Sequence, residues 1–244
     1  MMKTSLPISP GRLFTGLLTG FLFFAALLPT PGAEPFIHPG LLHSQLDIER
    51  MRAAVASEKG PIFEGFKVLE KSPYASLDYR MRGPFPEWGR APNIRMGETV
   101  SDAIAVYQHA LMWAVTGRKA HAEKAIGMIN AWVGTLKKVT GIDGVLASGL
   151  QGFMFANAAE LLRCTDSGWS EEEAKRCGQW FLDAWDPTIE HYAYFANGNW
   201  ETAALQSRVA IAVYCDKREM FEATMRYAVA GAGNGSIPHM VINA

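Results

Sequence analysis

Residues 190–202, with the sequence EHYAYFANGNWET, gather side chains that could move protons or bind a polar ligand. His191 and Tyr194 are side chains that can accept or donate a proton during catalysis. The amides of Asn197 and Asn199 can donate hydrogen bonds to an anion without adding a competing base. The segment is therefore a candidate catalytic site. In the structural alternative, Asn199 caps a helix and Trp200 belongs to the core.

Further candidates for substrate contact lie outside this segment. Gln151 interrupts an apolar run and could be a ligand-binding group or a buried polar residue whose hydrogen bonds are satisfied. Arg82 and Arg95 lie in a stretch rich in proline and glycine, where they could hold carboxylates or remain ordinary solvated charges. Trp88, in the same stretch, could stack on a sugar or pin the loop.

Carboxylates near two expected helix ends suggest a different chemistry. Asp166, Asp183, Asp186 and Glu190 could supply the pair of carboxyl groups that a glycoside hydrolase requires. Acidic residues are also common at helix ends for other reasons. We therefore rank this hypothesis below the one based on residues 190–202.

Helices must position these side chains, because apolar residues recur at i, i+3 and i+4 along most of the chain. Two helices are expected at 45–57 and 62–70, and residues 72–95 are expected to form one long loop. Apolar periodicity then predicts further helices over 103–115, 122–136, 150–163, 171–185, 200–214 and 217–230. Ser170 with Glu173, and Asp216 with Glu219, have the spacing of capping boxes.

No segment alternates as a strand, so the sequence predicts an all-α protein. Long helices joined by tight turns form antiparallel hairpins, and such hairpins assemble into a solenoid or a closed toroid. The sequence shows no fixed-period repeat, which argues against the solenoid.

The amino terminus has the features of a secretory signal peptide. Lys3 and Arg12 precede the uncharged run LFTGLLTGFLFFAALL at 13–28, and small residues follow up to Ala33. The run is short for a transmembrane helix, which needs about 20 apolar residues. We expect residues 1–33 to be removed and residues 34–244 to form a periplasmic or secreted domain with no stable membrane span.

The charge balance and the cysteines exclude some partners. Residues 1–33 hold two basic and no acidic side chains, so the remainder carries 21 basic and 24 acidic ones, a net charge of −3. Without a basic field, nucleic acid is not an expected partner. The spacing of Cys164, Cys177 and Cys215 fits no metal site. Cys164 and Cys177 could pair in an oxidising compartment, or all three could be free thiols.

Several segments, in order, resemble the alginate lyase superfamily of polysaccharide lyases. They are LHSQLDIERM at 42–51, ALMWAVTG at 110–117, GLQGF at 149–153, ANAAELLR at 156–163, NGNW at 197–200 and GNGSIP at 233–238. The resemblance covers nearly all of residues 34–244. It implies an α/α toroid, an incomplete barrel of antiparallel helical hairpins.

The resemblance also implies cleavage of a uronic acid polymer, such as alginate, by β-elimination without a cofactor or metal. Asn199 or Asn197 would then neutralise the uronate carboxylate, and His191 or Tyr194 would act as the base. Further catalytic Tyr, His and Arg residues usually follow the GNGS segment in this family, whereas the sequence ends at Ala244. We therefore expect the amino-terminal portion of such a lyase, either active or a glycan-binding remnant.

Overall fold

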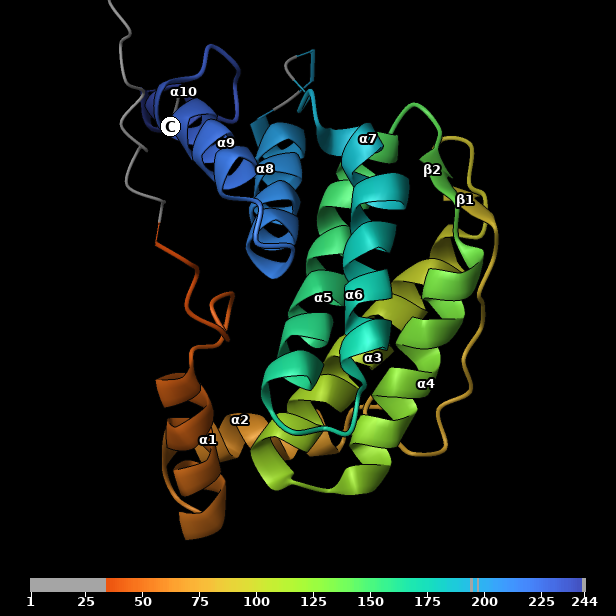
Figure 1. Cartoon of the computed structure of the whole chain (residues 1–244), viewed down its shortest axis with the longest axis vertical. Coiled ribbons are helices and arrows are strands. Elements are labelled where there is room, and N and C mark those ends of the chain that lie inside the picture. Colours follow the sequence, from red (N-terminus) through yellow and green to blue (C-terminus); the bar gives the residue numbers. More distant parts are fainter. Residues whose placement is uncertain (1–33, 194, 197, 243–244) are drawn as a thin grey trace, which may run out of the picture. The chain divides into compact units, whose positions relative to one another are not determined.

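The computed structural model describes residues 34–193, 195–196 and 198–242 (Figure 1). The expected signal peptide, Tyr194 and Asn197 lie outside the described residues. Contacts divide the chain into residues 1–34 and a second unit, Pro35–Ala244, which is almost entirely helical. The prediction of an all-α protein is confirmed.

The helices follow the predicted order closely. Their bounds are α1 (Gln45–Ser57), α2 (Gly60–Glu70), α3 (Met96–Thr116), α4 (Lys119–Thr135), α5 (Gly144–Cys164), α6 (Glu171–Trp180), α7 (Asp186–Ile189), α8 (Gly198–Tyr214), α9 (Arg218–Ala230) and α10 (Ile237–Ile242). A π-helical turn, η1 (Phe181–Trp185), joins α6 to α7. Ser170 and Glu173 form the predicted capping box at the start of α6.

Helices α3, α5 and α8 pack side by side as the central helices, and each is followed by a helix that runs back (α4, α6 and α9; Figure 1). A Cβ atom at Gly149 would collide with the backbone of Ala203, so α5 and α8 touch closely. At the other end, Arg163 Nη1 donates to Tyr214 O at 2.9 Å. The central helices therefore run parallel, with their amino termini at one end of the unit.

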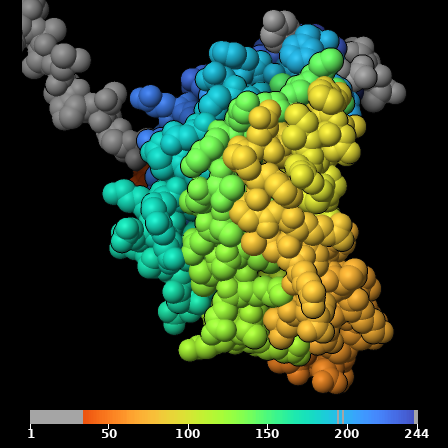
Figure 2. All heavy atoms as spheres, turned by 90° about the vertical axis from the view of Figure 1, so that its right-hand side faces the viewer, coloured from red at the N-terminus to blue at the C-terminus, as the bar shows by residue number. Residues whose placement is uncertain are grey.

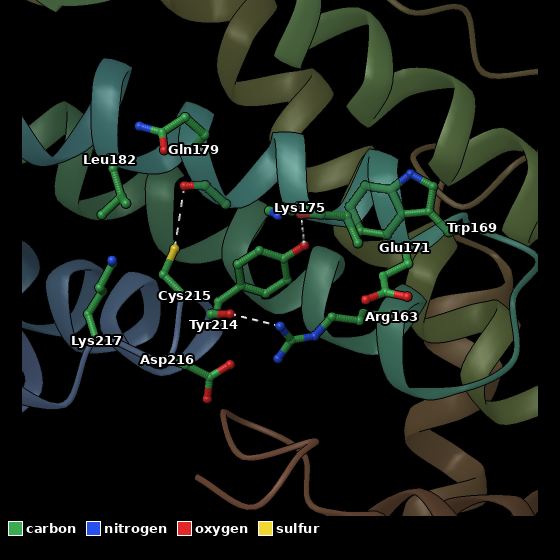
Figure 3. A pocket seen from close by; sticks show the side chains of 12 residues that line it. Arg163, Trp169, Glu171, Lys175, Gln179, Leu182, Tyr214, Cys215, Asp216 and Lys217 are labelled. Carbon is green, nitrogen blue, oxygen red and sulfur yellow. Dashed lines mark hydrogen bonds between the residues drawn. The ribbon is translucent and has the colours of Figure 1, made fainter. Parts of the chain in front are cut away.

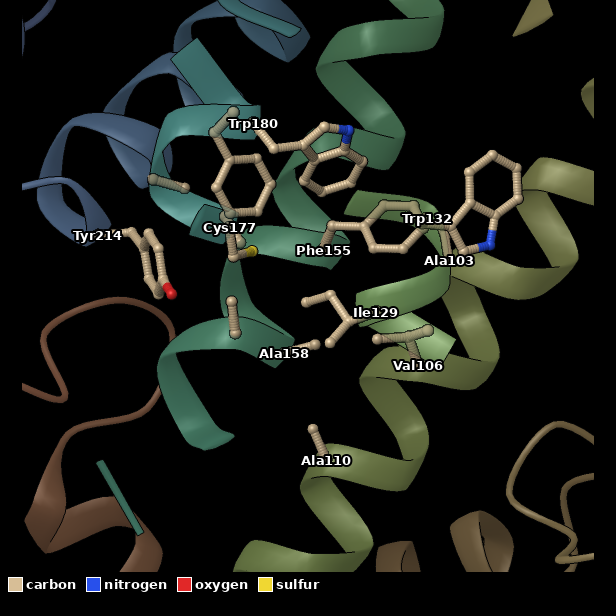
Figure 4. Packing of buried hydrophobic residues seen from close by; sticks show 14 of the residues in the cluster. Ala103, Val106, Ala110, Ile129, Trp132, Phe155, Ala158, Cys177, Trp180 and Tyr214 are labelled. Atoms are coloured by element: carbon tan, nitrogen blue, oxygen red, sulfur yellow. The ribbon is translucent and has the colours of Figure 1, made fainter. Parts of the chain in front are cut away.

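The core fills the space between α5 and the helices around it (Figure 4). The Phe155 ring lies 5.5 Å from Trp180, 5.6 Å from Trp185 and 5.9 Å from Trp132, between ring centroids. Alanines on α3 and α5 let the backbones approach. Helix α5 is apolar and long enough to cross a membrane, but 78% of its most apolar window is buried inside the protein, as in a core helix.

The long loop before α3 runs along α4 (Figure 2). Asp102 is fully buried and holds this loop by accepting hydrogen bonds from the Tyr79 hydroxyl at 2.8 Å and the Gly83 amide at 2.9 Å. The loop also contains a short strand, β1 (Glu87–Gly89), which pairs in parallel with β2 (Lys138–Thr140). The expectation of no strand was wrong, because three-residue strands are too short to show alternation.

One local prediction fails because a distant residue binds the same side chain, and the structure decides between the two states that the sequence left open for the cysteines. Asp216 does not cap α9; its carboxylate accepts from His38 Nε2 at 3.0 Å, and the backbone at Lys217 receives no side-chain cap. All three cysteines are free, so Cys164 and Cys177 form no disulfide. Cys215 instead donates to the carbonyl of Gly178, beside Cys177.

Candidate functional site at the amino-terminal end of the central helices

The parallel central helices place three helix starts at the same end of the unit. The first amides of a helix lack partners within it and carry partial positive charge, which favours an anion. The β2–α5 connection and the long loop meet at this end, where Arg90 Nε lies 3.2 Å from Asp143 Oδ2. Backbone contacts from Asp143 N to Arg90 O reinforce the junction.

Asn199 is the second residue of α8, and its side chain is exposed. It forms no hydrogen bond with any of the described residues, so it does not cap the helix as the structural alternative required. Among the described residues its amide therefore has no partner, and it lies at the start of the helix, where the helix dipole favours an anion. Trp200 is half-buried next to it. The other candidate amide, Asn197, lies outside the described residues.

His191 lies in the turn between α7 and α8 and is 85% exposed, with Nε2 3.6 Å from Glu190 Oε1. The following residue, Tyr192, has a left-handed backbone (φ 55°). Its ring stacks on Tyr227, with 4.2 Å between centroids. Tyr192 thus anchors the turn, while His191 remains accessible to solvent and substrate.

Gln151 lies two turns into α5, and its side chain is 6% exposed. It makes no hydrogen bond with another described residue. Because Gly149 lies against Ala203, Gln151 and the first turns of α8 occupy adjoining parts of two packed helices. The structure brings Gln151 and Asn199 to neighbouring helices but joins them by no direct contact.

The three candidates from the long loop have different surroundings. Arg82 is exposed, and only its backbone amide is bound to Asp102. Arg95 lies 4.9 Å from the Phe85 ring centroid, and its side chain remains 58% exposed. Trp88 is fully buried against Trp185, so it pins the loop and offers no surface to a sugar. The substrate-stacking prediction for Trp88 is wrong.

Sequence reasoning gave no role to Glu201, a fully buried acidic group in the first turn of α8. Its side chain is fully buried and accepts hydrogen bonds from the Tyr227 hydroxyl and from the Gly235 amide. Burial and the bond to Glu201 raise the pKa of Tyr227 to about 12. The donors lie 26 and 34 residues away along the chain, so only the glycine-rich GNGS segment hinted at a close contact.

A pocket of about 610 Å³ lies away from this end, between α6 and the α8–α9 connection (Figure 3). Trp169, Lys175, Tyr214 and Asp216 are among the residues lining it. None of the predicted site residues lines it. The candidate site is thus an open surface at the helix starts rather than this pocket.

Comparison with known proteins covers the resembling segments between 110 and 238 but not LHSQLDIERM at 42–51, which precedes the matched range. The model of the alginate lyase family matches residues 90–241, a range that includes Asn199, Glu201 and Gly235. No curated protein and no solved structure gives a significant match.

Proposed function

Because the matched region makes up more than half of the sequence, the chain belongs to the alginate lyase family, and we propose that it cleaves a uronic acid polymer by β-elimination. Family membership supports a polysaccharide lyase acting on an acidic polysaccharide. The exposed amide of Asn199 at the start of α8, which bonds to none of the described residues, is the observation that carries the mechanistic proposal.

The elimination makes three demands on the site. The C5 proton of a uronate is weakly acidic while the adjacent carboxylate is negative, so a donor must hold that carboxylate and stabilise the charge that builds on it. A base must remove the C5 proton. An acid must protonate the O4 atom of the leaving sugar.

Asn199 is suited to the first demand. Its amide donates hydrogen bonds without accepting the proton that the base must remove. The amino terminus of α8 adds partial positive charge at the same place. Asn197 is the alternative neutraliser, since it directly precedes α8.

His191 is our proposed group for proton transfer among the described residues. It is exposed in the turn that leads into α8, and an imidazole can act as base or acid near neutral pH. Tyr194, three residues further along the sequence, is the alternative. Neither assignment requires a cofactor.

The exposed guanidinium groups of Arg82 and Arg95 are proposed to attract the other carboxylates of the polymer. Gln151 and Trp200 are proposed to contact the sugars nearest α8. We further propose that the protein acts in the periplasm or outside the cell, on the basis of the signal-like residues 1–33.

Two of the four carboxylates that suggested the glycoside hydrolase alternative are bonded to neighbouring side chains. Asp183 accepts from Gln179 at 2.8 Å, and Asp186 accepts from Arg208 at 2.9 Å. Both carboxylates therefore serve contacts within the fold.

The proposal is tested by incubating the full chain with alginate and with glucuronan, and by following the absorbance of unsaturated uronate ends. We expect this absorbance to rise on one of the polymers, with products that lack the water added by hydrolysis. Products that contain that water would indicate a glycosidase. Binding of oligouronates without any product would indicate the glycan-binding remnant and contradict the lyase.

A further inference from the structure

Glu201 lies in the first turn of α8, two residues after Asn199, and points into the protein. Its side chain has no exposed surface. One carboxylate oxygen accepts from the Tyr227 hydroxyl and the other from the Gly235 amide. Within the described part of the chain, the carboxylate forms no ion pair. Its charge is instead stabilised by these two donors and by the positive end of α8.

The GNGS segment packs directly against this carboxylate. A Cβ atom at Gly233 would collide with the Glu201 carboxylate, and one at Gly235 would lie 2.5 Å from Glu201 Cβ. A Cβ atom at Gly198 would lie 2.6 Å from Asn234 O. There is therefore no room for a side chain at Gly198, Gly233 or Gly235. Residues 233–235 form a wedge that holds the start of α8 from one side.

The same contacts reach the turn that carries His191. Tyr227, which donates to Glu201, stacks on the Tyr192 ring at 4.2 Å with an interplanar angle of 27°. Arg208 extends the arrangement, because its Nη1 donates to Glu190 O at 3.0 Å and to the Tyr192 hydroxyl at 3.3 Å. A continuous chain of contacts thus links Glu201 to the residues on both sides of His191.

We propose that Glu201 is a positioning residue that fixes Asn199 and the His191 turn relative to each other. This inference rests on the proposed lyase function. Glu201 itself is too buried to touch a polymer, so it acts through the α8 start, through Tyr227 and through the GNGS wedge. A displacement of about 1 Å in a catalytic group can lower a rate by roughly a hundredfold.

The test replaces Glu201 with glutamine and measures kcat and KM on the uronan that the wild type degrades. Glutamine keeps the shape but has a single acceptor oxygen, so it can accept from only one of the two donors, and it removes the negative charge. We expect kcat to fall by about a hundredfold and KM to change by less than about threefold, as for an interaction expressed in the transition state. Tyr227→Phe keeps the stacked ring, loses only the hydroxyl, and should give a smaller loss of the same kind.

Glu160→Gln is the matched control, because Glu160 is an equally buried carboxylate at the opposite end of the central helices. It should lower thermal stability and leave kcat unchanged. Amide exchange should become faster at Gly235, whose amide donates to Glu201, and at residues 202–205, whose amides are bonded within α8, in Glu201→Gln, and remain slow at both places in the control.

Three results would overturn the positioning role. The first is an active wild type whose kcat survives Glu201→Gln. The second is unchanged amide exchange at Gly235 and at residues 202–205. The third is a changed shape of the pH–rate profile in Glu201→Gln, which would make Glu201 a proton-transfer group. A wild type that degrades no uronan would instead refute the proposed function itself, so the two failures are distinguishable.

Discussion

Buried carboxylates hold irregular segments at both ends of the central helices, but with different partners. At the carboxyl-terminal end of α5, Glu160 accepts from the Gly40 amide at 3.0 Å, from Arg163 Nη2 at 3.0 Å, and lies 2.6 Å from His38 Nδ1. At the amino-terminal end of α8, the donors to Glu201 among the described residues are a tyrosine hydroxyl and a backbone amide. Glu160 therefore has charged partners, whereas Glu201 has neutral ones.

We infer that the contacts of Glu160 stabilise the fold, whereas those of Glu201 position an exposed surface. The ion pairs around Glu160 fasten the segment before α1 onto α5, and Asp216 joins them through His38. At the Glu201 end, Arg82 and Arg95 remain exposed, and so does Asn199. Stability should therefore be most sensitive at the carboxyl-terminal end, and turnover at the amino-terminal end.

The largest loss of stability is expected from Glu160→Ala. Removing one partner of a buried ion pair leaves the other uncompensated and typically costs about 3–5 kcal/mol. Arg163, whose side chain is 27% exposed, should moderate the cost toward the lower figure. Urea unfolding followed by circular dichroism measures the change. A loss below about 1 kcal/mol would remove the distinction between the two ends.

Acid should destabilise the protein through a histidine pair between α3 and α4. His109 Nδ1 and His121 Nδ1 are 2.8 Å apart, and both side chains are buried. Burial, with the charge of His121, lowers the pKa of His109 to about 4. Between pH 4 and the ordinary histidine pKa of about 6.5, the unfolded chain therefore binds more protons at His109 than the folded chain does.

Stability should consequently be fully present above about pH 6.5 and fall as the pH drops toward 4, by roughly 3 kcal/mol for a shift of this size. Unfolding curves at several pH values measure it, with His109→Gln as the comparison variant. An equal acid sensitivity in His109→Gln would assign the effect to other groups.

Gly233→Ala should cost less stability than the changes above. It acts at the amino-terminal end of α8, next to Glu201. The new methyl group would meet the carboxylate of Glu201 and the hydroxyl of Tyr227, and overpacking of this kind costs about 1–3 kcal/mol. Gly127→Ala is the control, because a Cβ atom there meets no atom within 4 Å. Thermal unfolding of both variants measures the two changes in stability. Tolerance of alanine at 233 would argue against a tight wedge.

The smallest loss of stability is expected from Ser170→Ala, which removes the cap at the start of α6 and changes neither end of α8. Ser170 Oγ accepts from the Glu173 amide at 3.2 Å as the cap of α6. Loss of such a cap costs about 1 kcal/mol. A larger effect in chemical denaturation would show that the capping box supports more than its own helix.

The sequence predicted what local periodicity encodes. The bounds of α1, the capping box of Ser170 and the hairpin order all follow from spacing within a few turns. Contacts between distant residues were not predictable in this way. Asp216 pairs with His38 across 178 positions, and β1 pairs with β2 across about 50.

The same distinction between local patterns and distant contacts applies to the candidate site. The concentration of polar residues before α8 identified Asn199 and His191, and the structure leaves both exposed. Trp88 was misread because burial against Trp185 depends on a contact from a separate helix. Glu201 was missed because its partners come from α9 and the segment after it.

The most direct test compares the turnover of two amide variants on the same helix. Asn199→Ala removes the proposed carboxylate donor, and Gln206→Ala removes an exposed amide about two turns further along α8. We predict that Asn199→Ala lowers the rate of unsaturated-uronate formation by roughly a hundredfold or more, the scale of losing one oxyanion-type donor. Gln206→Ala should match the wild type. Equal rates for the two variants would contradict the assignment of Asn199 and, with it, the site at the start of α8.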